Sequence, residues 1–372
     1  MHPHIDKFNR YHGNYSRSGV QNLFIFIGCI IQGKTVNLYN LRDEVSKITK
    51  KYKSNAESHY KRLTRFLVLF SNGNLWTSIL EFGIELLDKN RWTLCYLDAT
   101  EWKIGKFSLH ILVLSIDYQN VAIPIYFQVY NHKGVLSEKK RIEFVEKVAA
   151  QINLKEKTII ADREFIGNDY FLKFQELGIN FVSRIRKEMY KTNILCSRNY
   201  ESIKKRALKK GKASALIQID GLKFRLWIVK NAQQNTDEPL IYILTNILDK
   251  RDTPDLYRLR WRIECLFKHL KTNGYNLEDL RITDLNKIRL LVSMLVLAYI
   301  LAISTAIKER KNKPVKKKVY QDQKQYDTIS LFKEGQSLLK QSFISLVRLL
   351  DIIQFIDIVL KAPLPFNIQF VQ

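Results

Sequence analysis

The chain has 372 residues, of which 46% are hydrophobic, and its 61 Lys and Arg against 36 Asp and Glu give a formal net charge of +25. The apolar content excludes a disordered chain, and the small numbers of Gly (14) and Pro (7) exclude a collagen-like or linker-type chain. The charge predicts a polyanionic partner, for which nucleic acid is the natural choice, although a merely basic soluble protein would have the same composition.

Residues 1–90 are predicted to be mainly helical. The pattern consists of an apolar stretch at Val20–Ile31, a helix at Leu38–Ile48, a polar turn at Tyr52–Ser54 and a basic helix at Asn55–Phe70. A short helix, a turn and a basic helix outline a helix-turn-helix, although any helical hairpin with a solvated basic face looks the same. We predict a helical DNA-binding region here, with Arg62 and Arg65 among the residues that contact DNA.

Residues 91–187 change to alternating strands and helices. Three runs rich in β-branched and aromatic residues come first, and the second and third are close enough to form a hairpin. The expected elements are strands at Thr93–Asp98, Phe107–Tyr118 and Val121–Tyr130, a helix at Ser137–Gln151, a strand at Thr158–Asp162, a helix at Asn168–Leu177 and a strand at Asn180–Ile185. This is the element order of a ribonuclease-H-like α/β domain, in which helices cover a mixed sheet.

The helical periodicity disappears over residues 183–246, and we assign residues 188–250 to an insertion. The segment 184–212 holds eleven Lys and Arg and two Glu. Short strands are expected at Ala215–Ile219, Phe224–Val229 and Leu240–Leu244. We predict a basic, β-rich insertion that interrupts the α/β domain, and the strand runs argue against a solvated loop.

Residues 251–310 are predicted to complete the catalytic α/β domain. A long helix is expected at Thr253–Gly274, with Pro254 in its first turn, and 18 uncharged residues follow at Leu290–Ile307. As a helix, this second run would be about 27 Å long, just short of the ~30 Å hydrocarbon core of a membrane. A buried helix across the central sheet and a membrane span both fit, and we favour the buried helix.

The last segment, residues 311–372, is expected to contain a basic tract and a helical region. The tract holds seven Lys and Arg between Lys308 and Lys318, and an amphipathic helix is expected at about Leu338–Leu360.

Cysteine usage and the N-terminus indicate the compartment. The four cysteines, Cys29, Cys95, Cys196 and Cys265, form no C-x-x-C pair and are too few to cross-link a secreted chain of this length. The first 17 residues are polar and lack the apolar segment of a signal peptide. We therefore expect a cytoplasmic protein.

Two aspartates, Asp98 and Asp162, lie at the ends of predicted strands. A carboxylate at the end of an apolar strand costs free energy unless it is solvated, paired or bound to a cation. Carboxylate oxygens suit Mg²⁺ and Mn²⁺. Taken alone, however, either aspartate also fits an ordinary turn.

Four polar residues share one face of the helix predicted at Thr253–Gly274. Tyr257, Arg260, Glu264 and Lys271 lie at offsets of 0, 3, 7 and 14, and therefore within about 60° of one another. Glu264 would ligate a metal ion, while Arg260 and Lys271 would hold phosphate oxygens. Ordinary charge pairing on an exposed helix is the alternative interpretation.

This spacing resembles the Y-R-E-K signature of DDE insertion-sequence transposases with a β-rich insertion in a ribonuclease-H-like catalytic domain. Asp98, in the sequence YLDAT, looks like the first catalytic aspartate of that family. Asp162, in the sequence DREF, looks like the second, in a motif usually written D-R-G-F. Glu164 replaces the common glycine, and whether it adds a further acid stays open. The order of the helical N-terminus, the insertion and the apolar helix also resembles the family.

The resemblance implies a metal-dependent enzyme that cuts and joins DNA. Asp98, Asp162 and Glu264 would hold two Mg²⁺ (or Mn²⁺) ions, one activating water or a DNA 3′-hydroxyl and the other stabilising the leaving oxygen. Members of the family act at terminal inverted repeats as a synaptic homodimer, which implies a nucleoid-associated prokaryotic protein. By the same resemblance, Tyr257, Arg260 and Lys271 would contact phosphates near the cleaved end.

Further DNA contacts are expected near this site. Trp261 would stack on a flipped base, as in relatives that form a DNA hairpin, or would pack at the helix flank, which we favour slightly. Arg184, Arg186 and Lys187 follow a predicted strand where the site should open, and they would track the DNA backbone or stay solvated.

Three other functions fit parts of the sequence. A catalytically inactive, transposase-derived DNA-binding protein would have the same charge and helical N-terminus, although the presence of all three acids favours an active enzyme. A metal nuclease would cut without joining, and sequence does not separate the two activities. A basic membrane-associated protein, anchored at Leu290–Ile307, is less favoured.

Overall fold

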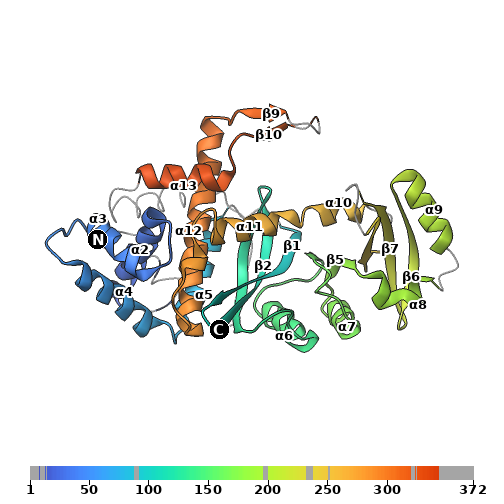
Figure 1. Ribbon diagram of the computed structural model, residues 1–372, viewed down its shortest axis with the longest axis horizontal. Helices are drawn as coiled ribbons and strands as arrows, with labels where there is room; N and C mark the ends of the chain where they lie inside the picture. The colour runs from blue at the N-terminus through green and yellow to red at the C-terminus, as the bar shows by residue number, and fades with distance from the viewer. Residues whose placement is uncertain are drawn as a thin grey trace.

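The structure is a computed structural model that describes residues 8, 13, 15–87, 92–195, 200–231, 238–249, 252–319, 323 and 325–342. Within these residues, eight strands form one mixed sheet in the order β3-β2-β1-β4-β5-β8-β7-β6. A helical bundle lies at one end of the elongated molecule, and strands β6 and β7 with helix α9 lie at the other (Figure 1). The strands are β1 (Leu94–Ile104), β2 (Phe107–Tyr118), β3 (Val121–Asn131), β4 (Thr158–Ala161), β5 (Asn180–Ile185), β6 (Lys212–Ile219), β7 (Leu222–Lys230) and β8 (Leu240–Thr245).

The first five strands confirm the predicted ribonuclease-H-like arrangement. Strand β2 pairs antiparallel with both β1 and β3, while β4 pairs parallel with β1 and β5 pairs parallel with β4. The β2–β3 hairpin turns at Gln119 and Asn120, whose φ angles of 50° and 65° are those of a type I′ turn. The fold is therefore a mixed sheet flanked by helices, as the element order predicted.

Residues 188–250 extend this sheet instead of forming a separate one. Strand β8 pairs antiparallel with β5, β7 pairs with β8, and β6 forms the far edge. The segment also contains helices α8 (Lys191–Leu195) and α9 (Tyr200–Lys210), so the expected absence of helix is wrong. Helix α9 buries Tyr200, Ile203 and Ala207, and it packs on β6 and β7. Three apolar residues among many lysines were too narrow a stripe to stand out as periodic.

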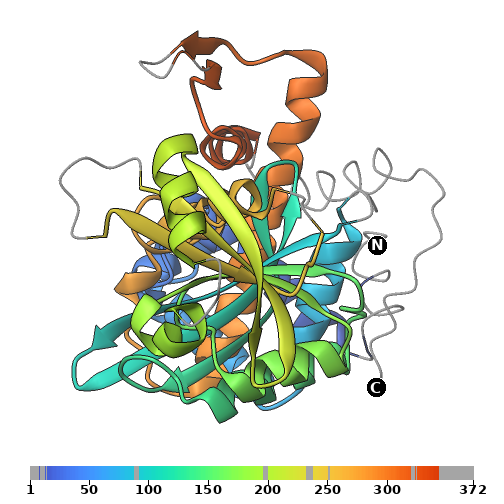
Figure 2. The same ribbon diagram turned by 90° about the vertical axis from the view of Figure 1, so that its right-hand side faces the viewer.

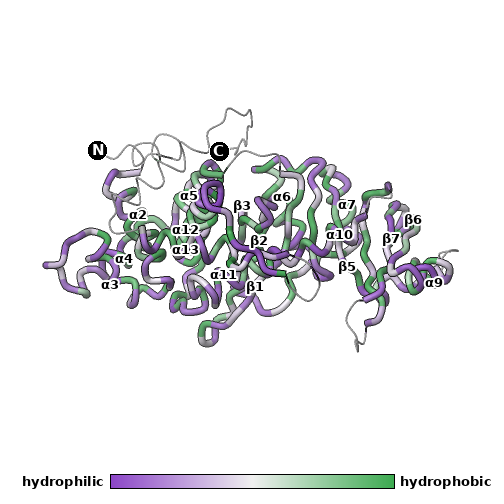
Figure 3. Tube along the Cα trace, turned by 90° about the horizontal axis from the view of Figure 1, so that it is seen from above, coloured by the Kyte–Doolittle hydropathy of each residue, from purple (hydrophilic) through white to green (hydrophobic). Residues whose placement is uncertain are grey.

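Helices cover both faces of the sheet near its centre. Helices α6 (Glu138–Ala149) and α7 (Asn168–Glu176) lie on the opposite side of the sheet from α11 (Trp261–Lys271), as the view from above shows (Figure 3). Ser137 caps α6, because its hydroxyl accepts a hydrogen bond from the Lys140 amide. Helix α11 packs on β1 and β3.

The long apolar run forms helix α12 (Leu285–Asn312), which passes through the middle of the molecule. Asp284 caps its N-terminus by accepting a hydrogen bond of 2.9 Å from the Lys287 amide. The helix packs against β3 and against helices of the N-terminal bundle. Its length and composition would also suit a membrane crossing, but 89% of its most apolar 18-residue window is buried within the protein. Burial inside the protein therefore accounts for its composition, as the favoured interpretation expected.

The N-terminal bundle and the C-terminal elements pack around α12. The bundle consists of α2 (Arg17–Gly33), α3 (Leu38–Thr49), α4 (Ala56–Phe70) and α5 (Leu75–Glu85), and α12 is followed by β9 (Lys317–Val319), β10 (Gln325–Asp327) and α13 (Leu331–Ser342). The expected helix at Leu338–Leu360 coincides with the end of α13, and the remainder of that prediction lies outside the described residues.

Candidate active site

The register of β1 and β4 places Asp98 and Asp162 side by side. Leu97 pairs with Ala161 in this parallel pair of strands, and each aspartate is the next residue of its chain. The expectation that the first strand ends at Asp98 is wrong, because β1 continues to Ile104. Strand β2 supplies hydrogen bonds to this extension after β4 has ended. Asp98 therefore lies where β1 is paired on one side only.

The helix expected at Thr253–Gly274 is broken, so the four Y-R-E-K residues do not share one continuous helix. Helix α10 (Thr253–Arg258) packs on β4, β5 and β8, whereas α11 packs on β1 and β3. At the junction, the amides of Arg260 and Ile263 donate to carbonyls three residues earlier, which is the pattern of a 3₁₀ turn. A 3₁₀ turn aligns residues three apart, and it places Tyr257 directly beside Arg260.

Arg260 and Tyr257 form hydrogen bonds with the three acids in this structure. The Arg260 guanidinium donates to Asp98 Oδ2 at 3.1 Å and, through its other terminal nitrogen, to Glu264 Oε1. The Tyr257 hydroxyl donates to Asp162 Oδ1 at 3.0 Å. Residues more than 160 positions apart in the sequence thus meet at Arg260, and the Tyr257–Asp162 pair lies beside them.

The cluster is largely removed from solvent. The side chains of Asp98, Arg260 and Glu264 are 15%, 18% and 32% exposed. Burial raises the pKa of Asp98 to about 7 against the opposing effects of Arg260 and the Ala99 amide, and the negative charges of Asp162 and Glu164 raise it further. Burial and the negative charge of Asp162 likewise raise the pKa of Tyr257. Perturbed carboxylates of this kind are typical of functional sites.

The donor atoms at this site suit a hard divalent cation, but their arrangement does not yet form a complete metal site. Asp98, Asp162 and Glu264 offer carboxylate oxygens, which Mg²⁺ and Mn²⁺ prefer. No group of three or more His, Cys, Asp or Glu residues within the described ranges is close enough to hold a metal ion. Arg260 lies between two of the acids, and its withdrawal would free their oxygens for a metal ion.

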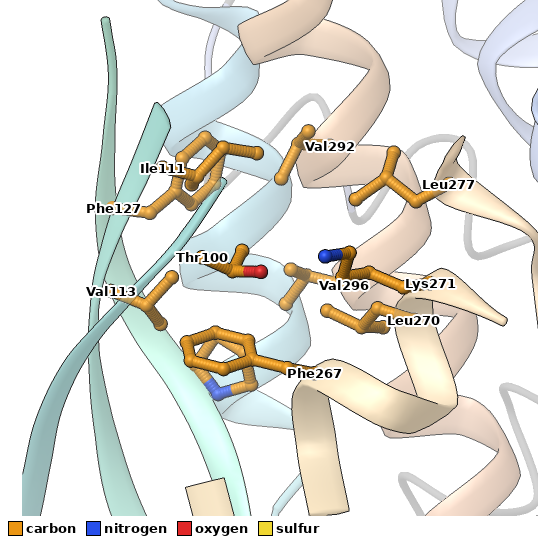
Figure 4. A pocket seen from close by; sticks show the side chains of 11 residues that line it. Thr100, Ile111, Val113, Phe127, Phe267, Leu270, Lys271, Leu277, Val292 and Val296 are labelled. Atoms are coloured by element: carbon orange, nitrogen blue, oxygen red, sulfur yellow. The ribbon is translucent and has the colours of Figure 1, made fainter. Parts of the chain in front are cut away.

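Lys271 lies farther along β1 than the acids. Its ammonium group donates to the Glu101 carbonyl at 3.2 Å and pairs with Glu278 at 2.9 Å. Its stem lines a small cavity of about 10 Å³ between the sheet and helices α11 and α12, opposite Thr100 (Figure 4). Lys271 lies seven positions after Glu264 on α11, which corresponds to a rise of about 10 Å along the helix axis. Lys271 is therefore not part of the Arg260 cluster.

The other sequence-predicted DNA contacts are scattered over the surface. Trp261 is 64% exposed, so the preferred expectation that it packs at the helix flank is wrong. Arg184 pairs with Glu238, Arg186 is exposed, and Lys187 lies 5.9 Å from the Tyr200 ring.

Arg62 and Arg65 lie on α4, in the helical bundle at one end of the molecule, whereas Arg184 lies on β5 of the central sheet (Figure 1). They line a groove of about 640 Å³ beside α4. The Arg62 guanidinium donates to Asn22 Oδ1 at 2.7 Å.

One positioning residue was not identified from the sequence. Arg262 forms an ion pair of 2.6 Å with Asp117 and donates to the hydroxyl of Tyr96 at 3.2 Å. These contacts attach the first turn of α11 to β1 and β2, and so fix the position of Glu264 relative to Asp98. No sequence signal distinguishes Arg262 from its neighbours, because its partners lie about 145 residues or more away.

Residues 137–301 match the family model of the transposase DDE domain. The matched segment contains Asp162 and the Y-R-E-K residues, whereas Asp98 precedes it. No curated protein matches the sequence.

A solved structure shares the fold. The cryo-EM structure of a piggyBac transposase synaptic complex with hairpin DNA superposes with a TM-score of 0.50 at 12% sequence identity, and the match covers 98% of this chain and 82% of that chain. At this level of identity, the likeness shows the fold and not the activity.

Proposed function

We propose that this protein is a DDE transposase that binds the terminal inverted repeats of an insertion sequence and catalyses divalent-metal-dependent cleavage and strand transfer of DNA. The observation that carries the proposal is that Arg260 hydrogen-bonds both Asp98 and Glu264 while Tyr257 hydrogen-bonds Asp162, inside a fold shared with a transposase. The match of residues 137–301 to the transposase DDE domain and the net charge of +25 support it.

In this proposal the three acids hold two Mg²⁺ or Mn²⁺ ions. Bound there, the metal supplies Lewis-acid stabilisation of the attacking and leaving oxygens during in-line displacement at phosphorus. Tyr257 and Arg260 exchange their carboxylate partners for phosphate oxygens near the scissile bond. Arg262 keeps α11 on the sheet, so that Glu264 stays opposite the two aspartates.

The remaining parts of the chain serve DNA binding and assembly. We assign duplex DNA to the helical region 1–90, with Arg62 and Arg65, and to Arg184, Arg186 and Lys187. We assign the exposed Trp261 to stacking on an unpaired base. We further propose the boundaries 91–187 and 251–310 for the catalytic domain, 188–250 for its insertion and 311–372 for the C-terminal region. A homodimer that synapses two transposon ends, in the cytoplasm at the prokaryotic nucleoid, completes the proposal.

The test is cleavage of a labelled duplex that carries the inverted repeat flanking the source gene. Wild-type protein should nick the repeat end with Mg²⁺ and not with EDTA, and Asp98→Asn, Asp162→Asn and Glu264→Gln should each abolish nicking while DNA binding is kept. Glu201→Gln on α9, an exposed acid far from the cluster, is the matched control and should cut normally. Mg²⁺-dependent cutting by all three variants would disprove the site, and binding without cutting by the wild type would favour the inactive DNA-binding alternative.

A further inference from the structure

A basic hairpin extends from the end of α12, away from the body of the molecule (Figures 1 and 2). We call residues 311–319 and 325–328 the basic arm. Its strands β9 and β10 pair antiparallel, with Lys317 opposite Asp327 and Val319 opposite Gln325. Neither the active-site argument nor the helical N-terminus gives this arm a role.

The base of the arm is firmly held. The Arg310 guanidinium donates to Glu334 at 2.6 Å and to the Ile329 carbonyl at 2.8 Å, and it also pairs with Asp327 of β10. One guanidinium therefore ties together α12, the returning strand and α13. The arm keeps a defined direction relative to the catalytic domain because of these contacts.

The arm has no hydrophobic core of its own. Every residue of β9 and β10 is exposed. A two-stranded hairpin without a packed face is only marginally stable in water. A hairpin of this kind gains stability when a partner covers it.

The charge of the arm identifies that partner as a polyanion. Lys311, Lys316 and Lys317 are exposed, and within the described residues no acid forms an ion pair with any of them. Mutual repulsion among these lysines is relieved by phosphates. A two-stranded ribbon also fits the width of the major groove, as β-ribbon DNA readers show.

The position of the arm matches the active site. In Figure 1 it rises above the side of the molecule where β1 ends and where α11 lies. DNA that enters the site from this side would pass beneath the arm before its strand reaches the acids.

We propose that the basic arm binds the phosphate backbone of duplex DNA next to the cleaved end, through Lys316 and Lys317. This inference rests on the proposed function and adds to it a contact surface outside the catalytic cluster. Each phosphate contact releases about one counterion and should therefore tighten binding about 5-fold at 0.15 M salt.

The experiment measures binding of a fluorescein-labelled 40-base-pair duplex as a function of salt. The double variant Lys316→Gln/Lys317→Gln should bind about 30-fold more weakly at 0.15 M salt, with a slope of log K against log salt that is smaller by about 2. The control Lys139→Gln/Lys147→Gln removes two exposed lysines from α6, on the opposite side of the molecule, and should bind like the wild type.

A second measurement uses the unmodified protein. The duplex should protect Lys316 and Lys317 from acetylation and leave Lys139 and Lys147 reactive. If the wild type bound DNA and the arm variant bound it equally well, the inference would be overturned. Equal reactivity of all four lysines with and without DNA would also overturn it. A wild type that binds no DNA would overturn the proposed function as well. Lysine-dependent binding to phosphatidylserine vesicles, with DNA binding unaffected, would replace DNA by a membrane as the partner and overturn the inference.

Discussion

We predict that Arg260 competes with a divalent metal ion for the acids, and its replacement by glutamine should reveal this competition. The Arg260 guanidinium bonds both Asp98 and Glu264. Arg260→Gln removes that charge and leaves two partly buried carboxylates facing each other. Breaking a fully buried pair costs about 3–5 kcal/mol, and the partial exposure of Glu264 lowers our expectation to about 2 kcal/mol of unfolding free energy.

A divalent metal ion should restore this lost stability, because in the variant it no longer has to displace the Arg260 guanidinium. We expect the dissociation constant for Mn²⁺, measured by electron paramagnetic resonance without DNA, to fall at least about 10-fold, which corresponds to about 1.4 kcal/mol. Urea unfolding in EDTA and in Mn²⁺ should show the variant destabilised only in EDTA.

The matched control for this prediction is Arg310→Gln. It breaks ion pairs of similar exposure, with Glu334 and Asp327, on helix α12 and outside the cluster. It should lower stability in both buffers and leave Mn²⁺ affinity unchanged. An Arg260→Gln protein with wild-type Mn²⁺ affinity would refute the competition.

Three further predictions concern pH and packing. Burial lowers the pKa of His269 to about 4, so the free energy of unfolding of the wild type should fall by up to about 3 kcal/mol as the pH falls from 6.5 to 4. Urea unfolding of His269→Asn over the same pH range should show a smaller fall. The pKa of Asp98 is raised to about 7, so in EDTA its contribution to the free energy of unfolding is present below about pH 4 and is lost as the pH rises to 7. If Asp98→Asn showed the same change of unfolding free energy with pH as the wild type over this range, the raised pKa of Asp98 would be contradicted. A Cβ at Gly335 would lie 1.7 Å from the Ala302 carbonyl oxygen. Gly335→Ala should therefore separate α13 from α12 and lower the free energy of unfolding by about 1–3 kcal/mol. An unchanged unfolding midpoint would show that these helices are not in contact.

Local patterns in the sequence predicted most of the fold. Strand β2 was expected at its observed bounds, because a run of twelve residues, eight of them Phe, Tyr, Ile, Leu or Val, ends at the polar turn Gln119–Asn120. Helix α12 was recognisable as buried or membrane-spanning, and its packing partners were needed to decide between the two. The extent of β1 beyond Asp98 was missed, since only its pairing with β2 defines it.

The candidate site was predictable in its members and not in its contacts. Asp98, Asp162 and Glu264 were selected by strand ends and by spacing on a helix. The helix break at Arg260 follows from packing on two parts of a twisted sheet, and no periodicity in the sequence marks it. The contacts of Arg260 with the acids and of Arg262 with Asp117 join distant segments, so their existence required the tertiary structure.

The most direct test of the proposed transposase is strand transfer, because it separates joining from cutting. A labelled duplex with a pre-cut inverted-repeat end and a free 3′-hydroxyl is incubated with supercoiled plasmid, Mg²⁺ and either wild-type protein or Glu264→Gln. The proposal predicts covalent transfer of the label to open-circular and linear plasmid by the wild type alone, and none in EDTA. Plasmid that is nicked without acquiring label would contradict a transposase and indicate a metal nuclease.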